Sequence, residues 1–298
     1  VLTLGTDISS LEALLLSYTI TYDGYTYNLM TPNVYSSDEF EAAYSYDGKD
    51  LGLTYTKEAS TFKLWAPTAD SVTLNIYEGG TAGTDDKVGS YEMTGGTRNE
   101  KGVWTYVLDG DWNGKYYTYT VNVANKVNEA CDPYARTTGV NGKRAMILDL
   151  DSTDPDGWDA DKNAVRHDGM NYTDAVIYEL HVRDLTNDSS SGVDSKYQGK
   201  FMGLTQTGTT TAGGNPTALD HMVNLGITHL HLIPVYDYGS VDETKLDTPQ
   251  FNWGYDPVNY NVPEGSYSSN PYDGNVRITE CKEMIQALHN AGFSVVMD

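Results

Sequence analysis

Alternation of apolar and polar residues predicts β-structure over about residues 50–150. Within the second of the alternating stretches, Val72, Leu74 and Ile76 share one face. The pair Asn113-Gly114 before the last stretch is a turn signal. No helical period separates the stretches, so the pattern predicts an antiparallel, immunoglobulin-like β-sandwich of about a hundred residues. The stretches are "TFKLWAP" (61–67), "SVTLNIYE" (71–78), "GVWTYVLDG" (102–110) and "KYYTYTVNV" (115–123).

After residue 174 the period changes, and apolar runs alternate with amphipathic stretches. The runs near 175–182, 227–235 and 293–297 predict strands, and "PTALDHMVNLG" and "TECKEMIQALHNAG" between them predict helices. Gly226 and Gly292 follow the two helical stretches as expected of helix ends. Strand–helix–strand order with right-handed crossovers predicts a parallel sheet.

The connections in this second region differ in length. Each helix returns to the next strand in about two residues, whereas the segments leaving the strands, 184–214 and 236–277, far exceed the usual two to six residues or so. Barrel and open-sheet enzymes place their binding sites on such segments, at the carboxyl ends of parallel strands. The segment 251–274 shows neither period, so we predict a continuous loop with a binding role.

The first 48 residues are the least periodic part of the chain. "SSLEALLLSY" predicts a short helix with Ser9 or Ser10 as its N-cap, and a turn-rich stretch follows. We therefore divide the chain into an N-terminal segment (1–48), the sandwich (49–150), a link (151–173) and the α/β region (174–298).

Charge and composition limit the classes of partner that the protein can bind. The formal net charge is −23, from 42 acidic and 19 basic residues, which argues against nucleic acid or an anionic membrane as a partner. No apolar run approaches 18 residues, so no membrane-spanning helix is predicted. Tyr (24) greatly outnumbers Phe (5), and tyrosine suits half-exposed strands and sugar surfaces alike. We expect a neutral ligand.

Cysteine usage and the first residues say little about chemistry. Cys131 and Cys281 form no metal-binding spacing, and Cys281 lies on an apolar helical stripe, where a buried free thiol is expected. The chain begins at Val1 without the basic stretch of a signal peptide, which indicates a processed or engineered N-terminus.

Polar and aromatic residues gather in one part of the long loop. Asn252, Trp253, Tyr255 and Asp256 lie within five positions, and Gly254 would let the backbone turn between the two rings. Aromatic rings pack on the C–H faces of sugars while amide and carboxylate groups bind hydroxyls, so the cluster fits a polysaccharide. An equally weighted alternative is a self-packed loop with Trp253 as buried anchor and Asp256 capping a turn.

Two further sets of residues have competing interpretations. A calcium site at Asp247 and Asp256 is a weaker hypothesis, because no regular ligand spacing is visible. Trp65 and Trp104 lie on predicted sandwich strands, where core packing is favoured over a sugar-stacking platform.

The cluster belongs to a segment that resembles a known family. "FNWGYDP" (251–257) is similar to the YNWGYDP signature of type I pullulanases, debranching enzymes of the α-amylase superfamily; only Phe251 departs from it. The resemblance covers about residue 28 to the end. It also includes, in the family's order, "TFKLWAPTADSVTLNIYEGG", "VNGKRAMILDLDSTDPDGW", "IYELHVRDLT", "HLHLIPVYDYGSVDE", "VPEGSYSSNP" and "VVMD".

This resemblance implies a fold and residue roles. The sandwich would be a carbohydrate-binding-like module, and the α/β region would form the first three β/α units of a (β/α)8 TIM barrel. Tyr255 would stack on the glucose before the scissile bond, with Asn252, Trp253 and Asp256 around it. Asp298, at the end of the third strand, would bond neighbouring groups of the site. The partner would be an α-glucan, with no cofactor required.

The resemblance also assigns no catalytic role to several polar residues on the strands. Glu179, His181 and Arg183 lie on the first strand and are expected to be structural. His229 and His231 are expected to point outward from the second strand. An extracellular or cell-surface location is expected, with the cytoplasm as the alternative.

The family's catalytic carboxylates follow later barrel strands, and the chain stops at the third. A (β/α)8 barrel needs about 250 residues, whereas 125 residues follow position 173. We expect the remaining strands in a second chain or a continuation, because the 293–297 edge would otherwise be unpaired. The alternatives are a non-catalytic α-glucan-binding protein and an isoamylase or branching-type enzyme.

Overall fold

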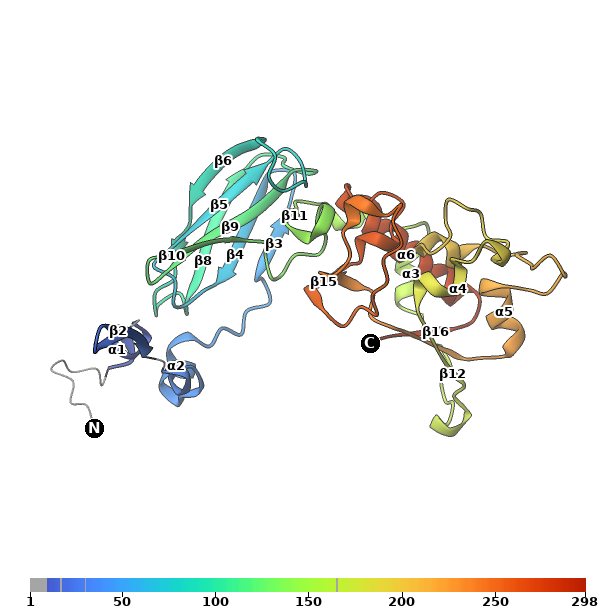
Figure 1. The fold of residues 1–298 in the computed structure, drawn as a ribbon, viewed down its shortest axis with the longest axis horizontal. Coiled ribbons are helices and arrows are strands. Elements are labelled where there is room, and N and C mark those ends of the chain that lie inside the picture. Colours follow the sequence, from blue (N-terminus) through green and yellow to red (C-terminus); the bar gives the residue numbers. More distant parts are fainter. Residues whose placement is uncertain (1–9, 17, 30, 165) are drawn as a thin grey trace.

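The computed structural model describes residues 10–298 except 17, 30 and 165. Figure 1 shows an N-terminal segment beside one end of a β-sandwich, and a mixed α/β region beside the sandwich's other end. The sandwich therefore lies between the two other parts.

The N-terminal segment has a small core of its own, formed by Leu11, Val34, Phe40 and Tyr44. The predicted first helix is confirmed, and Ser10 caps it by accepting a hydrogen bond from the Ala13 amide. Ser9 lies outside the described residues. The hairpin that follows was not predicted. The elements are α1 (Leu11–Leu15), β1 (Tyr18–Tyr22), β2 (Tyr25–Leu29), η1 (Pro32–Ser36) and α2 (Asp38–Tyr44).

The predicted antiparallel sandwich is confirmed. One sheet has the order β3-β4-β8-β7 and the other β10-β9-β5-β6, with β11 added to β9. The inward-facing Phe62, Leu74, Ile76 and Tyr117 fill the core between the sheets. The strands are β3 (Gly52–Tyr55), β4 (Ala59–Trp65), β5 (Ser71–Tyr77), β6 (Lys87–Glu92), β7 (Thr94–Gly95), β8 (Val103–Asp109), β9 (Tyr116–Val123), β10 (Lys126–Ala130) and β11 (Ala145–Met146).

The two tryptophans on sandwich strands serve packing, in different places. Trp104 packs against the sandwich core, as predicted. Trp65 is outside that core: its indole N–H donates to the Tyr44 and Lys101 carbonyls at 2.9 and 3.0 Å, and its ring meets Phe40 edge-on. Trp65 therefore fastens the N-terminal segment to the sandwich, and the core position expected for it is wrong. Alternation along β4 turns Phe62 and Leu64 inward and leaves Trp65 on the outer face.

The link between the sandwich and the α/β region contacts the long helix of the α/β region. Its elements are η3 (Leu150–Thr153), which begins at the end of the sandwich, α3 (Trp158–Lys162) and η4 (Tyr172–Asp174); η2 (Val140–Gly142) precedes the link. The Lys282 ammonium, on the long helix α6 (Gly274–Asn290), donates to the Thr153 hydroxyl at 2.6 Å and pairs with Asp154.

The α/β region contains the predicted parallel sheet, in the order β12-β13-β16. Ile177 pairs with His229 and His229 with Ser294, so the three carboxyl ends lie at one edge. The strands are β12 (Ile177–Leu180), β13 (His229–Leu232) and β16 (Ser294–Met297), and the helices besides α6 are α4 (Val182–Thr186) and α5 (Ala218–Leu225). Short 3-10 turns are η5 (Ser189–Ser191), η6 (Phe201–Thr205), η7 (Glu243–Lys245) and η8 (Gly265–Tyr267).

The two faces of this sheet differ. Leu230 and Leu232 pack with Met222 of α5 and Met284 of α6 in one apolar core. Alternation along β13 places His229 and His231 on the opposite face. The expectation that these histidines point outward is therefore wrong, because the leucines occupy the side that the helices cover. Buried Cys281 lies in the same core as a free thiol, as predicted.

The long loop after β13 is not continuous, which corrects the prediction for 251–274. Residues Pro257–Pro263 form β15, which pairs antiparallel with β14 (Tyr236–Tyr238) through two register shifts. Prolines at both ends and the irregular register obscured the alternation. Helix α6 also begins earlier than predicted, at Gly274, because the Asp273 side chain caps it.

No helix in the described part of the chain combines the length and the apolar character needed to cross a membrane.

Candidate functional site

Three aromatic side chains of residues 251–256, here called the aromatic loop, are open to solvent. Phe251 is 56% exposed, Trp253 62% and Tyr255 58%. The alternative with Trp253 as a buried anchor is therefore wrong. Trp253 and Tyr255 share a surface, because both line one shallow hollow. Its lining residues are Ser240, Phe251, Asn252, Trp253, Tyr255 and Asp256.

Internal hydrogen bonds hold the aromatic loop in its shape. The Asn252 amide oxygen accepts from the Gly254 N–H at 2.8 Å, and its amide nitrogen donates to Asp256 at 2.7 Å. Gly254 has a φ of +90°, and a Cβ there would lie 2.5 Å from the Pro234 carbonyl oxygen. Only glycine fits this close approach. The loop thus projects its rings outward while Asn252 and Asp256 serve its own scaffold.

The aromatic loop reaches the end of the third parallel strand. The Tyr255 hydroxyl donates to the Asp298 carboxylate at 2.6 Å. This bond raises the pKa of the Tyr255 phenol, because the charged neighbour opposes loss of the proton. Bonds from the Ser240 hydroxyl and the Asn252 amide lower the pKa of Asp256, outweighing its slight burial. The predicted residues Asn252, Tyr255, Asp256 and Asp298 are therefore brought together.

His181, at the end of β12, supports the aromatic loop from below. Its Nδ1 accepts from the Asp184 N–H at 3.4 Å, so its Nε2 carries the hydrogen and donates to the Asn252 carbonyl at 2.8 Å. The ring stacks on Phe251 with a centroid distance of 5.4 Å, and the Tyr267 hydroxyl lies 3.1 Å from Nε2. The structural role expected for His181 is confirmed, although sequence spacing gave no sign of its partner in the loop.

The other two residues expected to be structural lie at the same strand end. Glu179 lies on the open face of the parallel sheet, opposite His231. The Arg183 guanidinium lies 3.5 Å from the Asp184 carboxylate.

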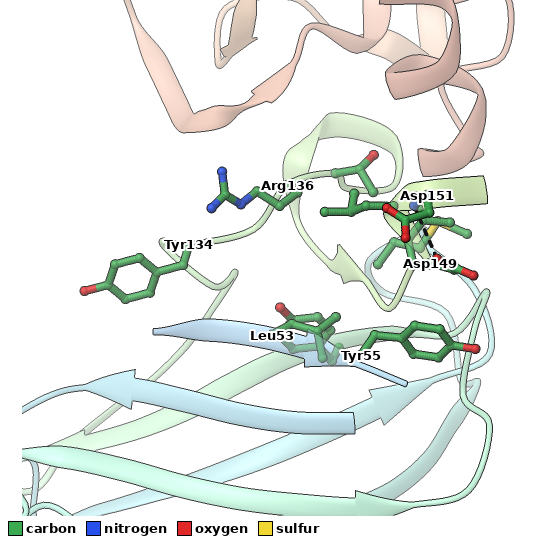
Figure 2. A pocket seen from close by; sticks show the side chains of 11 residues that line it. Leu53, Tyr55, Tyr134, Arg136, Asp149 and Asp151 are labelled. Carbon is green, nitrogen blue, oxygen red and sulfur yellow. Dashed lines mark hydrogen bonds between the residues drawn. The ribbon is translucent and has the colours of Figure 1, made fainter. Parts of the chain in front are cut away.

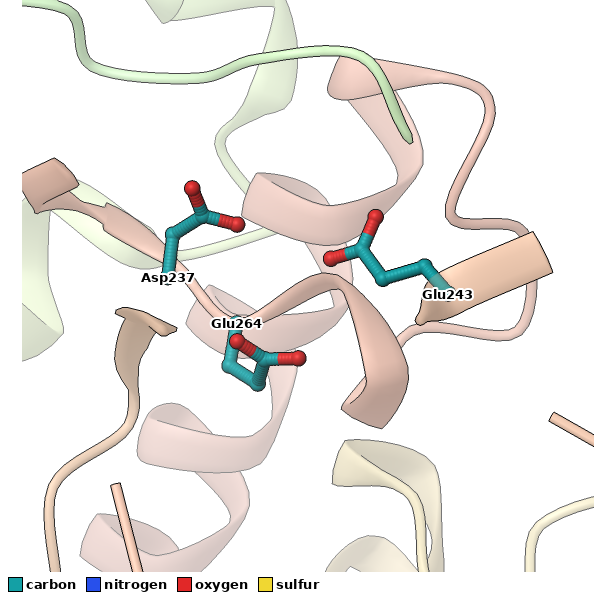
Figure 3. A group of neighbouring side chains, drawn as sticks. All are labelled: Asp237, Glu243 and Glu264. Atoms are coloured by element: carbon teal, nitrogen blue, oxygen red, sulfur yellow. The ribbon is translucent and has the colours of Figure 1, made fainter. Parts of the chain in front are cut away.

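Three buried carboxyl groups, Asp237, Glu243 and Glu264, lie close together (Figure 3). The fully buried Arg277 guanidinium of α6 lies between them, 2.9 Å from both Asp237 and Glu243. It also donates to the Gly139 carbonyl at 3.1 Å. The cluster therefore joins the helix, the long loop and the end of the sandwich.

This cluster does not fit a bound cation. Arg277 already occupies one oxygen each of Asp237 and Glu243. Both oxygens of Glu264 accept backbone N–H groups, from Tyr238 and Ser266. A divalent ion needs several free carboxylate oxygens, and here five of the six oxygens already accept from protein donors.

The earlier calcium hypothesis receives no support from this cluster, since it contains neither Asp247 nor Asp256.

Burial makes Glu264 sensitive to pH. Burial, followed by the nearby Glu243 and Asp237, raises the pKa of Glu264 to about 8 from an ordinary 4.5. The folded state therefore binds this proton more tightly, and stability should fall as pH rises from about 4.5 to 8. Urea unfolding at several pH values measures this slope, and Glu264→Gln should reduce it. The exposed Glu92→Gln is the control, and an equal slope in Glu264→Gln would contradict the assignment.

A separate slot lies between β3 and the link (Figure 2). Leu53 and Tyr55 form one side, and Asp149 and Asp151 of the link lie on the other. The Tyr55 hydroxyl donates to Asp111 at 2.8 Å. Two aromatic side chains, Tyr55 and Tyr134, are among the residues that line the slot (Figure 2).

Comparisons with known proteins agree with the sandwich and with the α/β region that carries the aromatic loop. Residues 50–135 match carbohydrate-binding module 48 (isoamylase N-terminal domain). The Bacillus subtilis (strain 168) pullulanase is 37% identical over 276 residues, which cover 92% of this chain and 36% of that protein. The pullulanase of Paenibacillus barengoltzii, solved in complex with maltohexaose and α-cyclodextrin, superposes with a TM-score of 0.82 at 48% identity, covering 88% of this chain and 39% of that one. The chain corresponds to the N-terminal portion of the type I pullulanases.

An isoamylase is a more distant relative. Isoamylase 3 of Oryza sativa subsp. japonica is 27% identical over 276 residues, covering 83% of this chain and 33% of that protein. The chain spans little more than a third of the B. subtilis pullulanase. The aromatic loop, the sandwich and the parallel strands therefore lie in the part shared with the pullulanases.

Proposed function

We propose that this chain supplies the carbohydrate-binding module and part of the active site of a pullulanase. The enzyme would hydrolyse α-1,6-glucosidic branch links of pullulan, starch or glycogen. The supporting observation is the exposed Tyr255 ring, which is held at the carboxyl end of the parallel sheet by Gly254 and Asp298. Strands β12, β13 and β16 would be the first three strands of a (β/α)8 barrel, with strands four to eight in a continuation or a second chain.

In this proposal the residues of the chain bind and orient the glucan. Retaining glycosidases cleave with two carboxyl groups about 5–5.5 Å apart, one as nucleophile and one as general acid. Asp256 is held by Asn252 and Ser240, and Asp298 accepts from Tyr255. We assign the cleaving carboxyls to the later strands. Tyr255 would offer its face to a glucose ring, while Asp298 holds the phenol in place.

The alternative functions make different demands on the same residues. A non-catalytic glucan-binding protein would use the aromatic loop without any later strands. An isoamylase or branching-type enzyme would share the sheet, but the lower identity to isoamylase 3 favours pullulanase.

Hydrolysis of pullulan by the complete polypeptide tests the proposed function. We expect new reducing ends from pullulan and none from linear amylose, which has no α-1,6 links. Residues 1–298 alone should release none, and activity should appear when the later strands are added. Cleavage of amylose, or inactivity of the complete polypeptide on pullulan, would contradict the proposal.

A further inference from the structure

A second hollow lies beside the aromatic loop, between the two long segments that leave β12 and β13. It has a volume of about 260 Å³, which is far more than the roughly 30 Å³ share of one water molecule and near the lower end of small-ligand clefts. Its walls include His181, Arg183, Asn187, Lys200, Asp247 and Asn252. We call it the loop hollow.

Lys200 brings a partly buried ammonium group to the loop hollow. Its Nζ donates to the Ser266 carbonyl at 2.8 Å, and no second acceptor for it occurs among the residues that the structure describes. Burial lowers the pKa of Lys200, although Glu280, Glu243 and Glu264 oppose the shift. An ammonium group has three N–H donors. Removing it from water without enough acceptors is costly, so ligand oxygens in the hollow would satisfy the remaining donors.

The other walls offer both donors and an acceptor. Within the described chain, the Arg183 guanidinium has a single carboxylate contact, to Asp184 at 3.5 Å, the outer limit of a hydrogen bond. The exposed Asn187 amide lies on the same side of the hollow as Arg183. The Asp247 carboxylate lines the hollow from the other long segment. An anion would meet this carboxylate in a protein of net charge −23. Sugar hydroxyls both donate and accept, so a neutral sugar fits the mixed lining better.

The loop hollow adjoins the aromatic loop. Asn252 lines both hollows, and His181 fixes its carbonyl at 2.8 Å. We propose that the loop hollow is a subsite for a further glucose unit of the α-glucan whose neighbouring unit lies on Tyr255. This proposal rests on the proposed function, because it places the subsite on the same substrate.

A subsite remote from the reacting bond should affect long substrates more than short ones. Binding that is equal in the ground state and the transition state changes KM and leaves kcat constant. Thr248 lies on the exposed rim of the hollow, so the larger side chain of Thr248→Trp would fill it. The substitution leaves the loop backbone intact, because the bond from the Thr248 N–H to the Lys245 carbonyl does not involve the side chain. Lys200→Gln would instead replace the ammonium group with an uncharged amide on a shorter side chain. Lys196→Gln, an exposed lysine of the same segment that lies outside the hollow, is the matched control.

The experiment measures kcat and KM of the complete enzyme on pullulan and on a short maltosyl-branched maltotriose. For Thr248→Trp and Lys200→Gln we expect a fivefold or larger rise in KM for pullulan, an unchanged kcat, and less than a twofold change with the short substrate. Lys196→Gln should match the wild type. Equal changes with both substrates would overturn the subsite in favour of loop distortion, and no change with either would also overturn it.

A competition experiment separates a sugar from an anion. Inorganic phosphate should leave the KM for pullulan unchanged in the wild type. Phosphate inhibition that Thr248→Trp abolishes would show an anion site and overturn the proposal. An inactive wild-type enzyme would instead refute the proposed function, whereas an active enzyme whose variants all match it would refute the subsite alone.

Discussion

Replacing Tyr255 by alanine in the complete enzyme will lower kcat/KM for pullulan by more than tenfold. The ring is 58% exposed and lines the hollow of the aromatic loop, so under the proposed function its contacts would be made chiefly with the glucan. A tenfold loss corresponds to about 1.4 kcal/mol, the scale of one aromatic contact. The free energy of unfolding should change by only about 0.5 kcal/mol, as for other surface substitutions. Steady-state kinetics and urea unfolding measure the two quantities.

Two further variants control this prediction. Tyr255→Phe keeps the ring and removes the bond to Asp298, so it should lose much less activity than the alanine variant. Tyr260→Ala removes a 69% exposed ring on β15, outside the hollow of the aromatic loop, and should retain full activity. A large loss of stability in Tyr255→Ala without a specific loss of activity would show that the ring anchors the loop.

Replacing Arg277 by leucine will destabilise the fold by about 3–5 kcal/mol, the usual cost of leaving a buried charge unpaired. Arg277 is fully buried and binds Asp237 and Glu243 at 2.9 Å each. Its removal leaves both carboxyl groups in a site where burial already raises their pKa values. Urea unfolding of residues 1–298 at pH 7 measures the loss.

The control for Arg277 is Gln286→Ala on the same helix. Gln286 donates one bond to the Asp156 carbonyl at 3.0 Å on the exposed side of α6. Its loss should cost about 1 kcal/mol, the usual worth of one such bond. An Arg277→Leu variant as stable as Gln286→Ala would contradict the role assigned to the buried cluster.

Periodicity was sufficient to predict the strands that carry each core. Phe62, Leu74 and Ile76 alternate with polar residues, and the sandwich was predicted from that pattern. Leu230 and Leu232 pack beneath helices as the strand–helix order required, and the parallel register followed. Local sequence identifies such elements because burial repeats with their own geometry.

Elements without a clean period of buried apolar residues were missed. Strand β15 is bounded by Pro257 and Pro263 and pairs irregularly with β14, so neither strand shows a clean period. The tyrosine-rich hairpin of β1 and β2 was taken as turns, because its alternation lies in exposed residues such as Tyr22 and Tyr25. Trp65 looked like a core residue until its contacts with the N-terminal segment were seen.

The candidate site was predicted in membership and only partly in mechanism. The "FNWGYDP" motif identified Asn252, Tyr255 and Asp256, and strand order placed Asp298 near them. Sequence could not show that the Asn252 amide is used within the loop itself or that His181 fixes its carbonyl. The His181 contact joins segments about 70 residues apart, which spacing along the chain does not encode.

A crystal structure of the complete enzyme with maltotetraose tests the central claim most directly, namely that the aromatic loop binds the glucan. We expect one glucose ring stacked on Tyr255, with sugar hydroxyls within about 3 Å of the polar groups around it. Maltotetraose bound only to the sandwich, with Trp253 and Tyr255 free of sugar, would contradict the claim.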